Sequence, residues 1–229
     1  MPQNPLSCLR DGLEYGVTAQ ADPATPLVRT KGMEVGVRTR AVEDLQSSLA
    51  LWLMDSESEL VFAGDTGGTE PTGPSRRMGI EWANYWTPVP WFILDADVAV
   101  SRARYKNPDE AGGKYVPEAI EKVVSIGAGV NDYNGWFGGM RLRYFGSRAL
   151  IEDNSQRSKS STLVNFKAGR HLTPNMDISL DIYNLFDRKT YDIEYFYESQ
   201  LAGETLPVAD HMVHPGEPRS IRVNWTIRY

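Results

Sequence analysis

The end of the chain constrains the fold more than any other feature, because residues 219–229 alternate without exception between two kinds of side chain. The apolar side carries Ile221, Val223, Trp225 and Ile227. The other side carries small polar residues and two arginines, Arg222 and Arg228. Side chains of a β-strand point alternately to its two faces, so this segment predicts a strand with one apolar and one polar face. The open question is whether the apolar face meets a protein core or lipid.

Composition does not decide that question. The 229 residues are 41% hydrophobic and 24% charged, as in a soluble protein, and no apolar run reaches the roughly 18 residues of a membrane helix. A membrane β-barrel has the same average composition, because half of each strand faces water. The net charge of -6 argues against a nucleic-acid partner. A single cysteine, Cys8, excludes an internal disulfide and a cysteine-rich metal site.

Alternation of the same kind recurs along the chain and predicts an all-β fold, since no helical stripe competes with it over a long window. We expect nine strands, with Leu13–Val17 too short and too interrupted by glycine to form a convincing tenth. The expected strands are residues 31–41, 45–63, 76–86, 91–105, 121–130, 136–146, 162–170, 176–186 and 219–229.

The connections between these strands alternate strictly in length. The short ones are 42–44, 87–90, 131–135 and 171–175, and the long ones are 64–75, 106–120, 147–161 and 187–218. An antiparallel up-and-down meander with tight turns at one rim and long loops at the other is typical of outer-membrane barrels. Several expected strands also reach the roughly 9–11 residues that cross a bilayer. The sequence therefore predicts a partial transmembrane β-barrel of about 9–10 strands.

Aromatic residues gather near the expected strand ends, where the girdles of a membrane barrel would lie. They are Trp82, Trp86, Trp91, Trp136, Phe137, Tyr144, Phe186 and Tyr229. Ordinary enrichment of aromatics in strands is the alternative explanation. The charged faces of the strands suit either a polar lumen or the solvated side of a soluble sheet. A soluble all-β domain that binds a ligand or carbohydrate therefore stays open at this point.

Three stretches together resemble TonB-dependent outer-membrane receptors. The first is Asn184-Leu185-Phe186-Asp187 with the basic residues that follow it. The second is the Gly216-Glu217-Pro218-Arg219 segment that leads into the aromatic-terminated last strand, and the third is residues 55–62. The resemblance covers residues 27–229 and implies the C-terminal part of a barrel of about 22 strands. Residues 1–26 would be an irregular segment or a truncated strand.

The resemblance also implies a location, partners and a function. The location is the outer membrane of a Gram-negative cell, where the chain would be a multi-pass β-barrel in contact with lipid. The function is energised uptake of a scarce substrate of the ferric siderophore, cobalamin or oligosaccharide class. A full-length receptor would use a plug domain and TonB. Neither the plug nor a secretory signal is recognisable here, so we expect a fragment that does not transport alone. Tyr229 with Trp225 resembles the signal read by the barrel-assembly machinery.

Candidate ligand contacts lie in the longest loop and near the outer rim. Tyr191, Tyr195 and Tyr197 stand among acidic residues and would stack on a ring-bearing ligand or glycan, or pair across two extended strands. Arg76 and Arg77, like Arg102 and Arg104, are expected near the rim. Such cations suit an anionic ferric siderophore or lipopolysaccharide phosphates, and a solvated rim is the alternative.

We expect no enzyme, no cofactor and no metal site. The sequence contains no nucleophile–base set and no phosphate-binding glycine loop. The only metal-like spacing is His211 and His214 beside Asp210. On a strand these two imidazoles would point to opposite faces, and no third ligand is evident.

Overall fold

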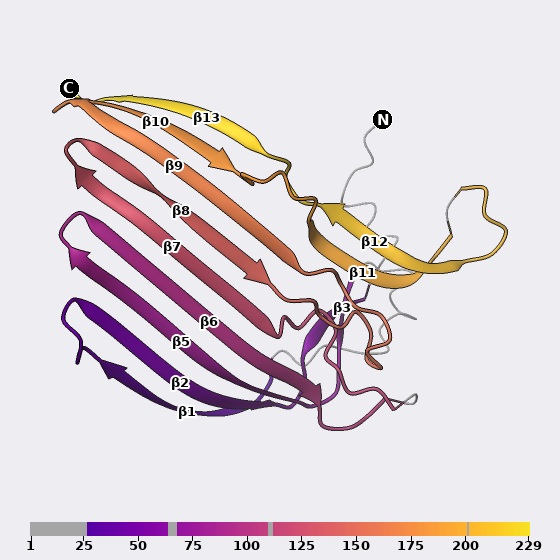
Figure 1. The fold of residues 1–229 in the computed structure, drawn as a ribbon. Coiled ribbons are helices and arrows are strands. Elements are labelled where there is room, and N and C mark those ends of the chain that lie inside the picture. The colour runs from indigo at the N-terminus through magenta and orange to yellow at the C-terminus, as the bar shows by residue number, and fades with distance from the viewer. Residues whose placement is uncertain (1–26, 64–67, 110–111, 201) are drawn as a thin grey trace.

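A computed structural model describes residues 27–63, 68–109, 112–200 and 202–229 of the chain. Its main element is a nine-stranded antiparallel sheet in the order β1-β2-β5-β6-β7-β8-β9-β10-β13 (Figure 1). The strands are β1 (Thr30–Thr39), β2 (Leu45–Ser56), β5 (Ser75–Val89), β6 (Phe92–Tyr105), β7 (Lys122–Tyr133), β8 (Trp136–Phe145), β9 (Ser161–Thr173), β10 (Met176–Tyr183) and β13 (Ser220–Ile227). The all-β meander predicted from the sequence is confirmed. None of the described residues forms a helix long and apolar enough to cross a membrane.

Two small hairpins correct the prediction outside this sheet. The expected strand 45–63 ends at Ser56, whose Oγ donates to the carbonyl of Ser58, and the chain restarts as β3 (Leu60–Ala63). β3 pairs with β4 (Gly68–Pro71), which lies in an expected loop. The longest expected loop contains a second hairpin, β11 (Tyr191–Ser199) with β12 (Val208–Pro215). In β11 the residues Tyr191, Ile193, Tyr195 and Tyr197 alternate as strand residues do, although the turn signals around the hairpin indicated a loop.

The connections are sorted by length as expected. Short turns and the C-terminus lie at one end of the sheet, and the long loops with both hairpins lie at the other (Figure 1). The turn between β7 and β8 shows how the short ones form. Asn134 (φ 52°) and Gly135 (φ 81°) are its two central residues, in the left-handed conformation of a two-residue type I′ turn. We call these two ends the short-turn end and the loop end.

The register places most of the apolar side chains of the nine strands on one face. Directly paired residues in an antiparallel sheet share a face, and one lateral row runs through Val35, Leu51, Ile80 and Val100. At the far edge Ile178 pairs with Trp225 and Leu180 with Val223. These side chains are exposed, with 68% of Val35 and 69% of Val223 open to the surroundings. The apolar face is therefore not covered by another layer of the described chain.

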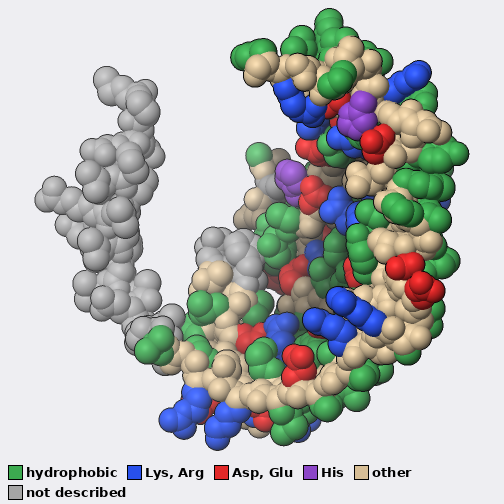
Figure 2. Space-filling model, turned by 90° about the vertical axis from the view of Figure 1, so that its left-hand side faces the viewer, with side chains coloured by type: hydrophobic (Ala, Val, Ile, Leu, Met, Phe, Trp, Pro, Cys, Tyr) green, Lys and Arg blue, Asp and Glu red, His purple; other side chains and the backbone are tan. Residues whose placement is uncertain are grey.

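The sheet curves into an arc with this apolar face outside. Viewed from the short-turn end, hydrophobic side chains line the outer edge of the arc, and charged side chains lie in its hollow (Figure 2). Among the described residues, β1 pairs only with β2 and β13 only with β10, so the arc is open. The buried core is small and lies at the loop end, around Ala103, Tyr105 and Val116. Phe137, one of the aromatics expected at a girdle, points into the hollow, where its ring covers Gly169.

The two sequence signatures near the C-terminus meet in space. Asn184 is buried and left-handed (φ 49°), and its amide donates to the carbonyls of Arg188 and Glu217. Its side-chain oxygen accepts from the Arg188 N–H. Asp187 accepts from the N–H of Arg219, one residue before β13. The motif residues thus connect the end of β10 to the start of β13, with Asp187 and Arg219 separated by 32 positions in the sequence.

Candidate functional site

The concave face is a polar surface built from ion pairs between strands. Arg141 on β8 holds Asp95 on β6 with two hydrogen bonds of 2.8 Å, and its Nη1 also donates to Ser125 at 2.9 Å. Gly127 on β7 lies directly between the paired residues. A Cβ at position 127 would lie 2.5 Å from Asp95 Oδ1 and 2.7 Å from Arg141 Nη2, so the glycine provides the space that this pair occupies.

The same pattern continues toward the C-terminal edge. Asp181 contacts Lys167 Nζ at 3.5 Å and accepts from Asn224 on β13. Nearer the short-turn end, Asp177 pairs with His171 Nδ1 at 2.6 Å and with Arg228. A cavity of about 420 Å³ opens on this face, and it is lined by side chains that include Asp95, Arg141, Lys167, Asp181 and Tyr183. The concave face therefore offers charges of both signs to whatever occupies the hollow.

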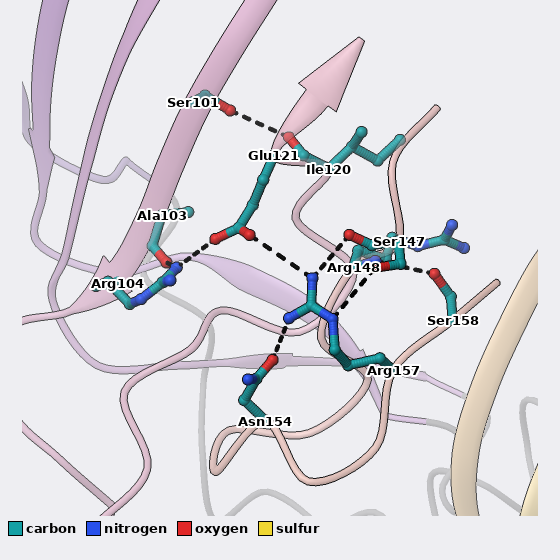
Figure 3. Close-up of polar contacts among 10 residues, drawn as sticks. All are labelled: Ser101, Ala103, Arg104, Ile120, Glu121, Ser147, Arg148, Asn154, Arg157 and Ser158. Atoms are coloured by element: carbon teal, nitrogen blue, oxygen red, sulfur yellow. Dashed lines mark hydrogen bonds and ion pairs between the residues drawn. The ribbon is translucent and has the colours of Figure 1, made fainter. Parts of the chain in front are cut away.

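A second group of polar contacts fixes the loops at the loop end (Figure 3). Glu121 precedes β7 and receives Arg104 from β6 at 2.8 Å and Arg157 from the 146–160 loop at 3.7 Å. Arg157 also donates to the side chain of Asn154 and, at 2.8 Å, to the carbonyl of Ser147. Arg104 stacks on the ring of Tyr115, with 3.5 Å between the guanidinium carbon and the ring centroid. Two long loops are thereby held against the ends of β6 and β7.

The hairpin β11–β12 is anchored to the same loops by a buried carboxylate. Glu194 is only 3% exposed, and it receives the backbone N–H of Lys159 at 3.0 Å and His211 Nδ1 at 2.9 Å. The imidazole of His211 also packs edge-on against Phe196, directly opposite it on β11. The hairpin is thus connected to the 146–160 loop through its own side chains.

An open cavity of about 490 Å³ lies between these loops and the sheet. Its lining includes Arg77 and Glu59, which form an ion pair, and Arg148 and Glu118, which form another. Burial raises the pKa of Glu118 above its ordinary value, and the Arg148 guanidinium offsets only part of this effect. One carboxylate oxygen of Glu118 is buried without a hydrogen-bond partner in the described structure. The cavity therefore combines paired charges with one unsatisfied acceptor.

The structure brings only some of the sequence-predicted contact residues together. Tyr195 and Arg77 line the same cavity at the loop end. Arg76 pairs across the strands with Asp55 and points to the convex face, because adjacent strand residues alternate. Tyr191 lies beside Lys159, whose Nζ is 5.1 Å from its ring centroid, and Tyr197 lies farther along β11. Sequence reasoning missed Glu118 and Glu121 and placed Glu194 only among the acidic residues around the tyrosines, because the partners of these carboxylates come from distant parts of the chain.

The remaining predicted residues are also placed by the strand geometry. Trp225 is 68% exposed on the convex face, and Tyr229 ends the chain at the short-turn end. His211 and His214 lie three residues apart on β12 and point to opposite faces. Within the described ranges, no group of three or more His, Cys, Asp or Glu side chains is arranged to hold a metal ion.

An antiparallel sheet with an apolar convex face, a polar concave face and loops sorted by length defines a segment of a membrane-type β-barrel wall. The family model described as TonB dependent receptor-like, beta-barrel matches residues 13–185. The chain belongs to this family of transport receptors, whose barrels are outer-membrane proteins.

Solved structures of the family share the fold. The ferric-catecholate import receptor Fiu from E. coli K12 is 21% identical and superposes with a TM-score of 0.63 over 88% of this chain and 28% of its own. The ferric yersiniabactin uptake receptor FyuA from Yersinia pestis is 19% identical, with a TM-score of 0.68 over 90% and 32%. The copper transporter OprC is 15% identical, with a TM-score of 0.63 over 87% and 32%. The chain thus spans less than a third of the length of these receptors.

Proposed function

We propose that the chain forms the C-terminal part of the barrel wall of a TonB-dependent receptor and crosses the outer membrane with its nine long strands. The receptor would import a scarce substrate of the ferric siderophore, cobalamin or oligosaccharide class. The observation that carries this proposal is the register of the sheet, which places exposed apolar side chains on the convex face of every strand. Such a face is stable against lipid and costly against water.

The height of the apolar face supports this assignment. On β5 the apolar side chains of this face run from Met78 to Trp86 near the short turns, with Ile80 and Trp82 between them. Eight steps of about 3.3 Å give roughly 26 Å along the strand. At a typical tilt of about 40° this corresponds to about 20 Å along the membrane normal, close to the roughly 25 Å of an outer-membrane barrel's apolar band.

The partners follow from the two faces. Lipid would contact the convex face, and a plug domain would contact the ion pairs of the concave face in a complete receptor that TonB energises. The nine-stranded arc has an open side, so we do not expect it to transport by itself. We further propose that Trp225 and Tyr229 form the signal by which the barrel-assembly machinery accepts this chain.

The cavity at the loop end is the proposed place of substrate contact. Arg77 and Tyr195 line it together, which supports a role for both in capture. Tyr191 and Tyr197 belong to the same hairpin and would extend the contact surface. Arg76 is outside this surface because its side chain leaves the opposite face of the sheet. We propose binding and transport for this site, and no catalysis.

Two neighbouring residues on β2 provide a direct test. Ala50 lies on the concave face and Leu51 on the convex face, where it is 47% exposed. In a variant with Cys8 replaced by Ser, Ala50→Cys and Leu51→Cys introduce single thiols one residue apart. In phosphatidylcholine vesicles, a charged maleimide should label position 50 and spare position 51, and in urea it should label both. A chain that stays monomeric and soluble without lipid, with both positions labelled, would support the soluble binding domain instead.

A further inference from the structure

The side chains that line the cavity at the loop end carry more negative than positive charge. Among the described residues its lining contains the carboxylates of Glu59, Glu118 and Asp192 and the guanidinium groups of Arg77 and Arg148. When all five groups are ionised, three negative charges against two positive ones leave one negative charge in excess. The cavity therefore differs from the cationic site that the sequence predicted for an anionic substrate.

Both guanidinium groups of the cavity are already bound to carboxylates. Arg77 donates through Nε and Nη2 to the two oxygens of Glu59, and the Nε bond measures 2.9 Å. The Nε of Arg148 donates to Glu118. Because the side chain of Glu59 is only 12% exposed, an anion that displaced it from Arg77 would leave a largely buried carboxylate unpaired. Neither arginine is thus available to an anionic group.

The charge of Glu118 is incompletely balanced by the residues around it. Its backbone is left-handed (φ 63°), a conformation that residues other than glycine seldom adopt. Oε2 receives Arg148, but Oε1 is buried without a hydrogen-bond partner among the described residues. Burial raises the pKa of Glu118, and the negative charge of Glu194 acts in the same direction. A positive charge brought into the cavity would stabilise the ionised form of Glu118.

Asp192 and Tyr195 provide an accessible acceptor and an aromatic ring in the same cavity. Asp192 is exposed near the start of β11 and forms no ion pair with any described residue. Burial raises the pKa of the Tyr195 hydroxyl, and the nearby charge of Glu118 adds to this effect. Carboxylates and the face of a tyrosine ring both attract an ammonium group.

We propose that this cavity binds a primary ammonium group carried by the substrate. The proposal deepens the proposed function and rests on it, because the cavity is the proposed place of substrate contact. An ammonium group has three donors and no acceptor, so it can pair with Asp192 and balance Glu118 without displacing either arginine. Within the proposed substrate classes, the cavity selects members with a free amine and disfavours those that would bring a negative charge to it.

The test uses three forms of one disaccharide that differ in charge. In mildly acidic buffer the glucosamine disaccharide is cationic, its N-acetylated form is neutral and its N-succinylated form is anionic. Each is titrated calorimetrically into the detergent-solubilised chain. The cavity variant Glu118→Gln/Asp192→Asn removes two negative charges with little change of shape. The matched control Glu57→Gln/Glu198→Gln removes the same charge from exposed positions that do not line the cavity.

We expect the unmodified chain to bind the amine form about three- to tenfold more tightly than the N-acetylated form, and the N-succinylated form most weakly. The cavity variant should lose this order, and the control should keep it. Equal binding of the three forms, or no binding of any of them, would overturn the ammonium site. An unchanged preference for the amine in the cavity variant would also overturn it.

A single substitution separates the loss of charge from a loss of folding. Asp192→Asn keeps the ion pair between Arg148 and Glu118, and it should still reduce the preference for the amine by about two- to threefold. An undiminished preference in this variant would count against the site. Maleimide labelling of positions 50 and 51 tests the membrane wall independently. A failed labelling pattern with the amine preference intact would overturn the wall alone, so the two failures are distinguishable.

Discussion

Asp95 and Arg141 are joined by two hydrogen bonds of 2.8 Å although they lie on strands that are not neighbours. The strand between them contributes Gly127, which has no side chain to separate the two charged groups. The ion pair between Asp95 and Arg141 therefore depends on the absence of a side chain at position 127. This relationship connects three consecutive strands of the wall at one level of the hollow.

Replacing Gly127 with Ala should break this pair rather than the sheet. The atoms nearest to the new Cβ are the ends of two flexible side chains, which can swing aside. Arg141 is 45% exposed, so the expected loss in the free energy of unfolding is about 1 kcal/mol or less. Urea unfolding in micelles measures it. In an Arg141→Gln background the Ala substitution should cost less, because the ion pair is already lost and Asp95 is no longer held beside the new Cβ.

Gly129 provides the matched control for this experiment. It lies on the same strand and face as Gly127, but a Cβ there would meet nothing closer than 3.8 Å. Gly129→Ala should therefore leave the unfolding midpoint nearly unchanged. An equal loss at positions 127 and 129 would show that the strand needs glycine for backbone reasons, and that the ion pair is not the cause.

Asn184 should be important for closing the last strand onto the sheet. Asn184→Ala removes the hydrogen bonds to Arg188 and to the Glu217 carbonyl, and this side chain is buried. Unsatisfied buried groups cost about 1–3 kcal/mol, and the remaining chain must also hold a left-handed residue without its side-chain contacts. We expect faster proteolysis between β10 and β13. Asn175→Ala, in an exposed short turn, is the control and should leave the cleavage rate unchanged.

Most of the fold could be predicted from the period-two alternation of side chains within the strands. The observed register shows why this alternation is informative. A side-chain period of two fixes the face of every residue in a strand, so Val35 and Val223 could be assigned to one surface without knowing their neighbours. The alternation of short and long connections along the chain then predicted the up-and-down order of the strands. The hairpin β11–β12 was expected only as one of two alternatives for the longest loop, because its strands pair with each other outside the main sheet and turn residues surround them.

The candidate site was less predictable because it depends on contacts between distant loops. Arg76 and Arg77 are adjacent in the sequence, but they face different surfaces, and alternation alone could have separated them. The sequence around Glu121 and Glu194 contains no comparable pattern that would identify the partners of these two carboxylates. Their partners Arg157 and Lys159 lie 36 and 35 residues away, in a loop whose conformation follows from tertiary packing.

The loop that carries Glu118 should become less stable as the pH rises. Burial raises the pKa of Glu118 above its ordinary value of 4.5, so the folded loop binds a proton more tightly than the unfolded chain does. The resulting stabilisation is complete below the ordinary pKa and is lost as the pH rises through the raised pKa. The Glu118 amide donates to the Ala149 carbonyl at 2.9 Å, so its hydrogen-exchange protection factor reports this change.

Glu118→Gln should remove this pH dependence, because the amide does not titrate. The ratio of the protection factors of the unmodified chain and the variant should fall as the pH rises. Glu152→Gln changes an acidic residue in the adjacent loop and is the control, with a ratio that stays level. A falling ratio for both variants would assign the effect to the charge of the loops as a whole.

The buried carboxylate of Glu194 anchors the β11–β12 hairpin and should control how easily the hairpin separates from the 146–160 loop. Glu194→Ala leaves the Lys159 N–H without its acceptor and His211 Nδ1 without its carboxylate. A buried donor left unpaired costs about 1–3 kcal/mol, which is enough to release a two-stranded hairpin from the 146–160 loop. Hydrogen exchange at Lys159 and trypsin cleavage after it should both accelerate, while the amides of β8 and β9 keep their protection. Glu198→Ala, on the same face of β11 but exposed, should change neither rate. Equal acceleration by the two substitutions would mean that the hairpin is held by its own strand pairing, with no contribution from the buried carboxylate.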